Sequence, residues 1–135
     1  MLMSNGNWAK ADGTLIEAAT GLARAIQSAP QWEEFQRARA AFESDPDLAM
    51  LLSRLRELSA LWRIAKNSGR GLAGTDASDL ADLQARLQAH PLFVRQQDAV
   101  RALMAMFQQV NQILSAELGL DFAANAAPQG GGCCG

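Results

Sequence analysis

Tyrosine is absent from this sequence and histidine occurs once, and the 135 residues include only three tryptophans, five phenylalanines and two cysteines. Because aromatic and β-branched residues favour strands, their scarcity argues against a β-sheet fold. Both cysteines, Cys133 and Cys134, stand at the C-terminal end, so a disulfide framework cannot hold the folded body together. Outside that end, His90 alone cannot supply the ligand set of a structural zinc site.

A strong charge of either sign is also missing, since the formal net charge is -2 and the isoelectric point is near 5.3. No overall positive field exists to hold a polyanion, so direct nucleic-acid binding is not expected. No stretch reaches the ~18 uninterrupted apolar residues of a membrane span, and residues 1–10 lack the basic start and apolar run of a signal peptide. These absences predict a cytoplasmic protein without a membrane partner.

The residues that are abundant, above all Ala and Leu, favour helices. The length suits one domain with a modest core. We therefore predict an all-α fold, a helical bundle of four to five helices in a single domain over residues 14–122. The segments 1–13 and 123–135 have no apolar period and are rich in small and polar residues, so we expect flexible tails there.

Two of the predicted helices are long, at about 46–67 and 92–118, where apolar residues recur at three- and four-residue steps. The pair Asp45-Pro46 is a start signal for the first, because Asp caps exposed amides and Pro is tolerated in the first turn. His90-Pro91 precedes the second, and Gly119 can end it. Shorter helices are expected at about 14–27, from residue 30 onward, and between residues 75 and 90.

Helices of this length exceed the average of about 11 or 12 residues, so short neighbours cannot cover them fully. We expect the apolar ridges along 46–67 and 92–118 to coil side by side and to leave apolar surface for a partner, which predicts a homodimer or higher oligomer. The candidate interface residues are Leu103, Met104, Phe107, Val110, Asn111 and Leu114. Asn111 either fixes the register against a partner helix or faces solvent. The alternative is that the whole stripe is core within one chain.

A basic cluster near the end of the first long helix contains a single acidic residue, Glu57. Its candidate docking patch consists of Arg56, Arg63, Lys66 and Arg70. One reading is a solvated face whose cations complement the helix C-terminus. The other is a docking patch for an acidic protein surface or for RNA.

Catalytic chemistry is not indicated by any motif. His90 lies in a linker without a second histidine, and the glycine-rich run 69–74 follows a helix and lacks the Gly-Lys-Ser/Thr of a phosphate loop. We therefore predict no catalytic residues, no required cofactor and no enzyme activity. Cys133 and Cys134 are candidate ligands for a soft metal or an iron-sulfur cluster, but a four-thiolate site needs twice as many cysteines as this chain has. The alternative is an unstructured tail with reactive thiols that bind no metal.

Residues spread along the chain resemble the YlbF/YmcA family of small bacterial helical regulators. The similarity covers roughly residues 15–122 and lies mostly in packing positions. Its N-terminal part is carried by Leu22, Ala25, Ile26, Ser28, Phe35, Ala38, Phe42, Asp45, Ala49, Leu51 and Leu52. Its C-terminal part is carried by His90, Pro91, Ala99, Leu103, Val110, Asn111, Ile113, Leu114 and Leu118.

This resemblance implies an all-α fold with a long C-terminal helix, self-association and an adaptor role without catalysis. It further implies assistance to RNA processing and decay together with an endoribonuclease, with effects on competence, sporulation and biofilm development. Some members carry C-terminal cysteines associated with iron-sulfur clusters, which Cys133 and Cys134 resemble. The leading hypothesis is a regulatory adaptor. The alternatives are a metal or iron-sulfur redox sensor and an RNA-binding helical module.

Overall fold

The computed structural model describes residues 13–128, and this part of the chain contains helices and no strand. The helices are α1 (Gly13–Gln27), α2 (Pro30–Ser44), α3 (Pro46–Asn67), α4 (Gly74–Ala89), α5 (Pro91–Leu118) and α6 (Phe122–Ala126). The all-α prediction is confirmed, including both long helices. The one-turn helix α6 was not predicted, and all of it after Phe122 lies in the segment 123–135 that was expected to be a flexible tail.

Proline and a capping residue define the start of each long helix. The Leu48 amide of α3 donates a hydrogen bond of 2.8 Å to Oδ2 of Asp45, and the Leu92 amide of α5 donates one of 3.2 Å to Nδ1 of His90. Each bond satisfies one of the amides that a helix start leaves without an intrahelical partner. Gly119 ends α5 in the left-handed conformation, with φ of 72°, which glycine adopts at little cost.

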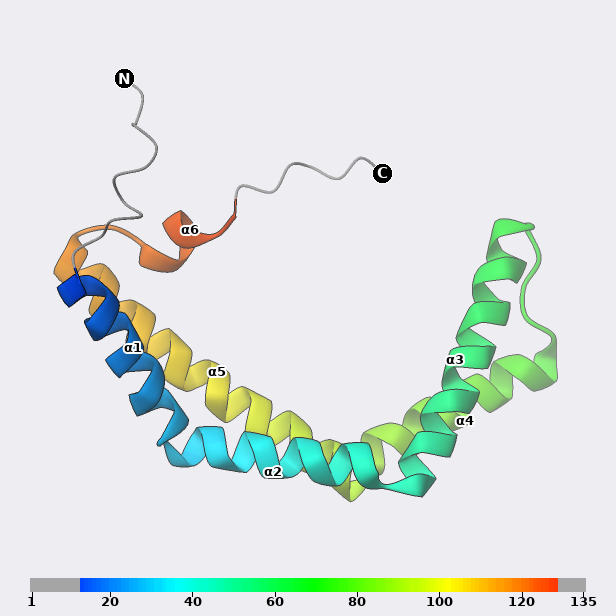
Figure 1. Cartoon of the computed structure of the whole chain (residues 1–135). Coiled ribbons are helices and arrows are strands. Elements are labelled where there is room, and N and C mark those ends of the chain that lie inside the picture. Colours follow the sequence, from blue (N-terminus) through cyan, green and yellow to red (C-terminus); the bar gives the residue numbers. More distant parts are fainter. Residues whose placement is uncertain (1–12, 129–135) are drawn as a thin grey trace.

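The helices form an open arch with two arms (Figure 1). One arm combines α2 and α5, with α1 and α6 at its far end, and the other is the α3–α4 hairpin. The expectation that the two long helices lie side by side is wrong, because α5 packs against α2 and α3 packs against α4. Each long helix therefore has a shorter partner that leaves part of its surface uncovered.

The best-buried part of the core lies between α3 and α4, near the elbow where the two arms meet. Leu48 and Leu58 are fully buried. Around Leu48, Leu51 and Leu55 pack partly buried residues of the neighbouring helices, namely Phe42, Leu80, Leu83, Leu87 and Leu92. This cluster includes side chains from α2, α4 and α5, so it fixes the junction of the arms as well as the hairpin.

A second, narrower seam joins α2 to α5. Ala38 of α2 and Ala99 of α5 are both buried, and small side chains of this kind let two helices approach closely. On the surface of the seam, the Arg95 guanidinium donates hydrogen bonds of 2.7 and 3.2 Å to the two carboxylate oxygens of Glu34. The hydrogen bond from Arg95 lowers the pKa of Glu34, and the same bond raises the pKa of Arg95.

Between residues 13 and 128, none of the helices combines the length and apolar content that a bilayer span requires.

Candidate interaction surfaces

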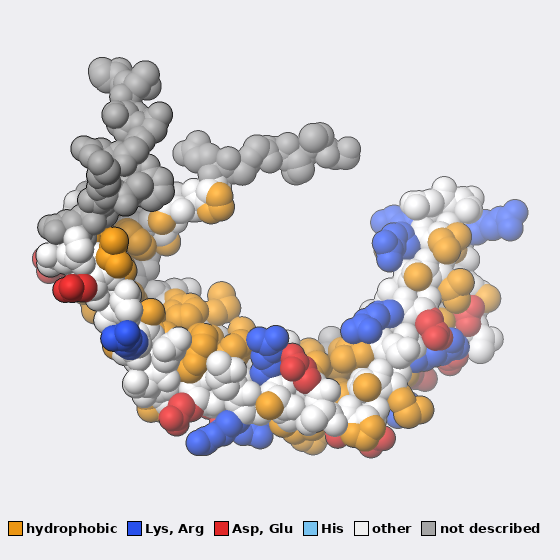
Figure 2. All heavy atoms as spheres, viewed as in Figure 1, with side chains coloured by type: hydrophobic (Ala, Val, Ile, Leu, Met, Phe, Trp, Pro, Cys, Tyr) orange, Lys and Arg blue, Asp and Glu red, His pale blue; other side chains and the backbone are white. Residues whose placement is uncertain are grey.

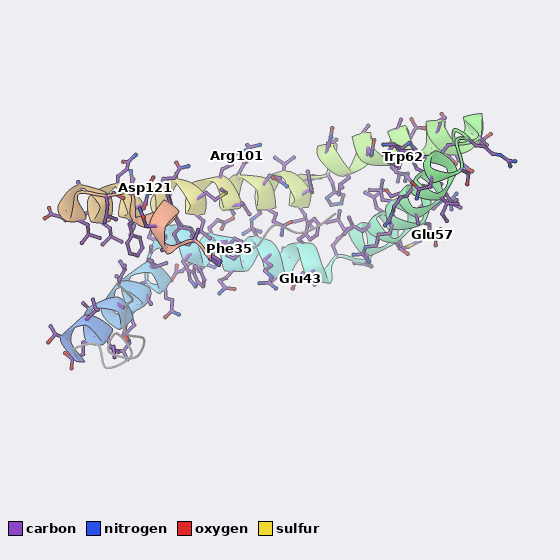
Figure 3. The ribbon with its side chains drawn as sticks, turned by 90° about the horizontal axis from the view of Figure 1, so that it is seen from above. Phe35, Glu43, Glu57, Trp62, Arg101 and Asp121 are labelled. Atoms are coloured by element: carbon purple, nitrogen blue, oxygen red, sulfur yellow. The ribbon has the colours of Figure 1, made fainter. Side chains whose placement is uncertain are left out.

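Helix α1 is amphipathic but almost unpacked. Its polar residues Glu17, Thr20 and Arg24 lie on one side, and its apolar residues recur at three- and four-residue steps on the other. No residue of α1 is buried, and Leu15 and Ile16 are 63% and 55% exposed. Its main contacts are with α2, and seen from above it diverges from α5 (Figure 3). An isolated helix of 15 residues is marginal in water, so this apolar face requires a covering surface.

The end of the arm that carries α1 exposes further apolar side chains on α5 and around α6 (Figure 2). We call the whole region the end surface, and its members are Leu15, Ile16, Leu22, Ile113, Leu118, Leu120 and Phe122, between 38% and 65% exposed. Each leaves on the order of 100 Å² accessible, so their summed area approaches the ~800 Å² that one partner buries in a standard interface, spread over two sides of α5 because Ile113 and Leu118 lie about 140° apart around that helix. A helix over about 14–27 was predicted from the sequence, but none of its residues was predicted to be part of the interface.

The interface residues predicted on α5 divide into two groups. Leu103 is 6% exposed and belongs to the core between α2 and α5, so it is not available to a partner. Met104 and Phe107 are 54% and 41% exposed, and Val110 and Leu114 are half-buried. One residue along a helix rotates the side chain by about 100°, which separates Leu103 from Met104. That these exposed residues contact a partner stays a prediction.

Asn111 has a role that neither reading of the sequence included. Its Oδ1 accepts hydrogen bonds from the Ala123 amide at 2.9 Å and from Oγ of Ser115 at 3.3 Å. The Ser115 hydroxyl oxygen in turn accepts a bond of 2.9 Å from the Phe122 amide. These side chains hold the first turn of α6 against α5, and thereby place Phe122 at the end surface. The polar residue in the stripe thus fastens the C-terminal helix.

The predicted docking patch lies on α3 and the loop after it, and it separates into a stripe and an isolated residue. Arg56, Arg63 and Lys66 lie on one face of α3, and we call them the basic stripe. The Lys66 ammonium lies 4.9 Å from the ring centre of Trp62, which is 46% exposed. Arg70 follows the end of the helix and lines a hollow of about 520 Å³ that Asp76 also lines.

Lys and Arg side chains are visible on the side of the α3 arm that faces the opening of the arch (Figure 2). Arg54, on another side of the helix, donates a hydrogen bond of 3.1 Å to Glu57 and forms an ion pair with it. None of the ion pairs in the described part of the chain involves Arg56, Arg63 or Lys66.

His90 lies at the elbow and acts in the fold. Besides capping α5, its Nε2 lies 3.9 Å from Oδ2 of Asp45, the oxygen that caps α3. The two capping residues thus link the starts of the two long helices. Both residues thus have a structural role at the elbow.

Comparison with known proteins adds the family. The family model described as control of competence regulator ComK, YlbF/YmcA, matches residues 15–119, most of the chain. The chain belongs to the YlbF/YmcA family. The resemblance noted in the sequence is thereby confirmed. No curated protein is similar enough to count as a relative.

The fold of this chain is similar to that of a solved structure described as a protein of unknown function (DUF964) from Bacillus stearothermophilus. Its TM-score is 0.53 at 16% sequence identity, and the alignment covers 78% of this chain and 93% of that chain. At this identity the likeness concerns the fold alone.

Several residues that carry the YlbF/YmcA pattern are core residues in the structure. Ala38, Leu51, Ala99 and Leu103 are buried, which explains a family likeness built mainly on packing. Cys133 and Cys134 lie outside the described residues, and the metal-ligand hypothesis for them stays a prediction. Within residues 13–128, no group of three or more His, Cys, Asp or Glu side chains is arranged to hold a metal ion.

Proposed function

We propose that this YlbF/YmcA protein is a non-catalytic regulatory adaptor that self-associates through its end surface and presents the rest of the arch to partner proteins. The observation that carries the proposal is α1, an amphipathic helix of 15 residues without a buried side chain. A lone chain gains little from ordering such a helix, because ordering the backbone costs about 1–2 kcal/mol per residue. A second copy that covers the apolar face supplies the missing stabilisation.

A second copy is the occupant that we favour for the end surface. The apolar area is of the size that one side of a standard interface buries, and a two-fold axis would bring identical apolar patches together. Self-association also agrees with what the family resemblance implies. In this arrangement α1 and the end of α5 from each chain would form a four-helix contact, in which each apolar face is covered by the other chain.

The regulatory part of the proposal rests on the family, whose name refers to control of a competence regulator. We further propose that the partners belong to the machinery of RNA processing and decay, with an endoribonuclease as the candidate. This step rests on the resemblance alone. A role as adaptor is supported by an open arch with long uncovered helix faces, since such faces provide contact area for other proteins.

Light scattering coupled to size-exclusion chromatography tests the self-association. We expect a molar mass of at least twice 14.5 kDa at micromolar concentration. A species of 14.5 kDa at every concentration would remove the argument from α1. For the regulatory partners, affinity purification from the native cell with and without nuclease treatment should recover RNA-processing proteins in both samples. Recovery of unrelated proteins alone would contradict this part of the proposal.

A redox or metal sensor is the second candidate, favoured by the adjacent Cys133 and Cys134 in a run of glycines. Two thiolates per chain are half of a four-thiolate set, so a dimer or a partner would have to supply the remainder. Anaerobic purification with the native partners, followed by iron analysis and visible absorption, tests it. Iron bound in proportion to protein and lost in a Cys133→Ser/Cys134→Ser variant is expected. A colourless, iron-free complex would contradict it.

A further inference from the structure

On the inner side of the arch, Lys and Arg side chains are visible along the α3 arm and apolar side chains along the other arm (Figure 2). On the α3 arm lie the basic stripe of Arg56, Arg63 and Lys66 and the half-exposed ring of Trp62. Between Leu58 and Ala73 the sequence has no acidic residue, so no carboxylate in the second half of α3 offsets the positive charge of the stripe. The stripe spans about 15 Å at ~1.5 Å per residue, roughly three helical turns.

A shallow hollow at the elbow links this stripe to α5. It measures about 390 Å³ and is lined by Phe42 and Glu43 of α2, by Ala49, Leu52 and Arg56 of α3, and by Gln96 of α5. Glu43 is already engaged, because Arg39 donates it a hydrogen bond of 2.8 Å. Arg56 therefore enters the hollow without an ion-pair partner, next to the apolar side chains of Phe42 and Leu52.

The α5 side of the hollow continues as an apolar face. Val100, Met104 and Phe107 follow Gln96 at steps of four, eight and eleven residues, so they share its side of the helix. Met104 is 54% exposed and Phe107 41% exposed. Orange side chains on the inner side of this arm in Figure 2 agree with that placement.

From this arrangement we propose that the inner face of the arch binds an acidic amphipathic helix of a partner protein. Its apolar stripe would lie against Met104 and Phe107 and enter the elbow hollow, and its carboxylates would pair with the basic stripe. The inference rests on the proposed adaptor role and specifies the partner's chemistry. A helix fits because residues seven apart on it are separated by about 10 Å, as are Arg56 and Arg63.

Nucleic acid fits this face less well. The apolar half of the face offers nothing to a phosphate backbone, and the whole chain carries a formal net charge of -2. On α3 the basic stripe is accompanied by the ring of Trp62, and the exposed ring of Phe107 belongs to the other arm, whereas surfaces for single strands generally stack several bases along a basic groove. An acidic amphipathic helix uses both halves of the face, because its carboxylates can pair with the basic stripe and its apolar side can cover the α5 face.

Synthetic amphipathic peptides of about six turns test the proposal directly. Three peptides share one leucine face and carry Glu, Gln or Lys at the remaining positions, and a short oligouridylate serves as the nucleic-acid probe. Binding to the full-length protein is followed by fluorescence anisotropy. We expect the Glu peptide to bind at least about tenfold more tightly than the other peptides, with affinity falling as salt rises from about 50 to about 200 mM.

The matched variants change the same number of charges at different places. In Arg63→Glu/Lys66→Glu the attraction to the Glu peptide becomes repulsion, so its affinity should fall about tenfold or more. In Arg37→Glu/Arg101→Glu the reversed residues are already in local ion pairs with Glu33 and Asp98, and affinity should stay within about twofold. Arg101 points away from α2 when the arch is seen from above (Figure 3). Circular dichroism should show the same helicity for both variants.

The proposal is overturned if the three peptides bind equally, if none binds, or if the Arg63→Glu/Lys66→Glu variant binds the Glu peptide as the wild type does. Tighter binding of the oligouridylate, lost in that variant, would assign the face to nucleic acid instead. Light scattering keeps this result separate from the proposed function. If the wild type and the Arg63→Glu/Lys66→Glu variant both assemble while no peptide binds, only the inference about the partner fails.

Discussion

Replacing Leu15 by Glu places a charge within the proposed self-contact while changing little inside one chain. Leu15 is 63% exposed in the lone chain, so covering it removes on the order of 100 Å² of apolar surface from water. At ~25 cal/mol per Å², that area is worth about 2.5 kcal/mol. A two-fold symmetric dimer contains the side chain twice, so the substitution should weaken dimerisation by about 5 kcal/mol, or about five-thousandfold.

Sedimentation equilibrium over a range of concentrations measures this change in the dissociation constant. The control is Thr20→Glu, which adds the same charge to the polar side of α1 and should leave the dissociation constant within a few-fold of the wild type. Because Leu15 is largely exposed, the stability of the monomer should change by no more than about 0.5 kcal/mol. A Leu15→Glu protein that assembles as tightly as the wild type would refute the reasoning, as would equal weakening by Thr20→Glu.

Three further predictions concern contacts within the chain. Asp45→Ala removes the side chain that caps the Leu48 amide, and should lower the free energy of unfolding by about 1 kcal/mol. Circular dichroism should then show a melting temperature about 4 °C lower. An unchanged melting temperature would contradict this role of Asp45. The pKa of Glu34 is lowered by Arg95 from its ordinary value of 4.5, so its stabilising contribution is present above that value and is lost as pH falls through the lowered pKa. The Glu34→Gln variant should therefore have a lower melting temperature than the wild type at neutral pH and the same melting temperature in strong acid. A difference in melting temperature that persists in strong acid would contradict the assignment to the charged Glu34 carboxylate. Asn111→Ala should speed hydrogen exchange of the α6 amides and leave that of α3 unchanged, and equal protection of α6 in both proteins would rule out the fastening role.

The positions of the helices could be predicted from the sequence because their start signals are local. Asp45-Pro46 and His90-Pro91 combine a capping side chain with a proline that is tolerated in the first turn, and the structure begins α3 and α5 at those prolines. The apolar period then extends each helix to the predicted end. Asn67 and Leu118 are the last residues of the two helices, as expected.

The pairing of the helices could not be predicted in the same way. Apolar residues at three- and four-residue steps indicate that a helix has an apolar face, but they do not indicate which of the other helices covers that face. The sequence analysis joined the two longest faces, whereas α3 pairs with α4 across a short glycine-containing loop, and α5 pairs with α2. Ala38 and Ala99 are part of the family resemblance in the sequence, but nothing in the sequence assigns them to a contact between α2 and α5, where both are buried.

Much of the candidate site depends on this pairing. Leu103 and Met104 are neighbours in the sequence, and only the position of α2 decides that the first is buried and the second exposed. Helix α6 is five residues long, too short to show a period, and it is held by side chains of Asn111 and Ser115 that are distant in the sequence. The basic stripe was recognised from composition, but its relation to the elbow hollow required the fold.

Hydrogen exchange of the α1 amides as a function of protein concentration tests the central claim most directly, because it reports whether this helix is covered. The account predicts slow exchange in α1 at concentrations where the protein is assembled, and fast exchange after dilution below the dissociation constant, with α3 protected in both. Fast exchange in α1 at every concentration, in a protein that is nevertheless oligomeric by light scattering, would show that the end surface is not where the copies meet.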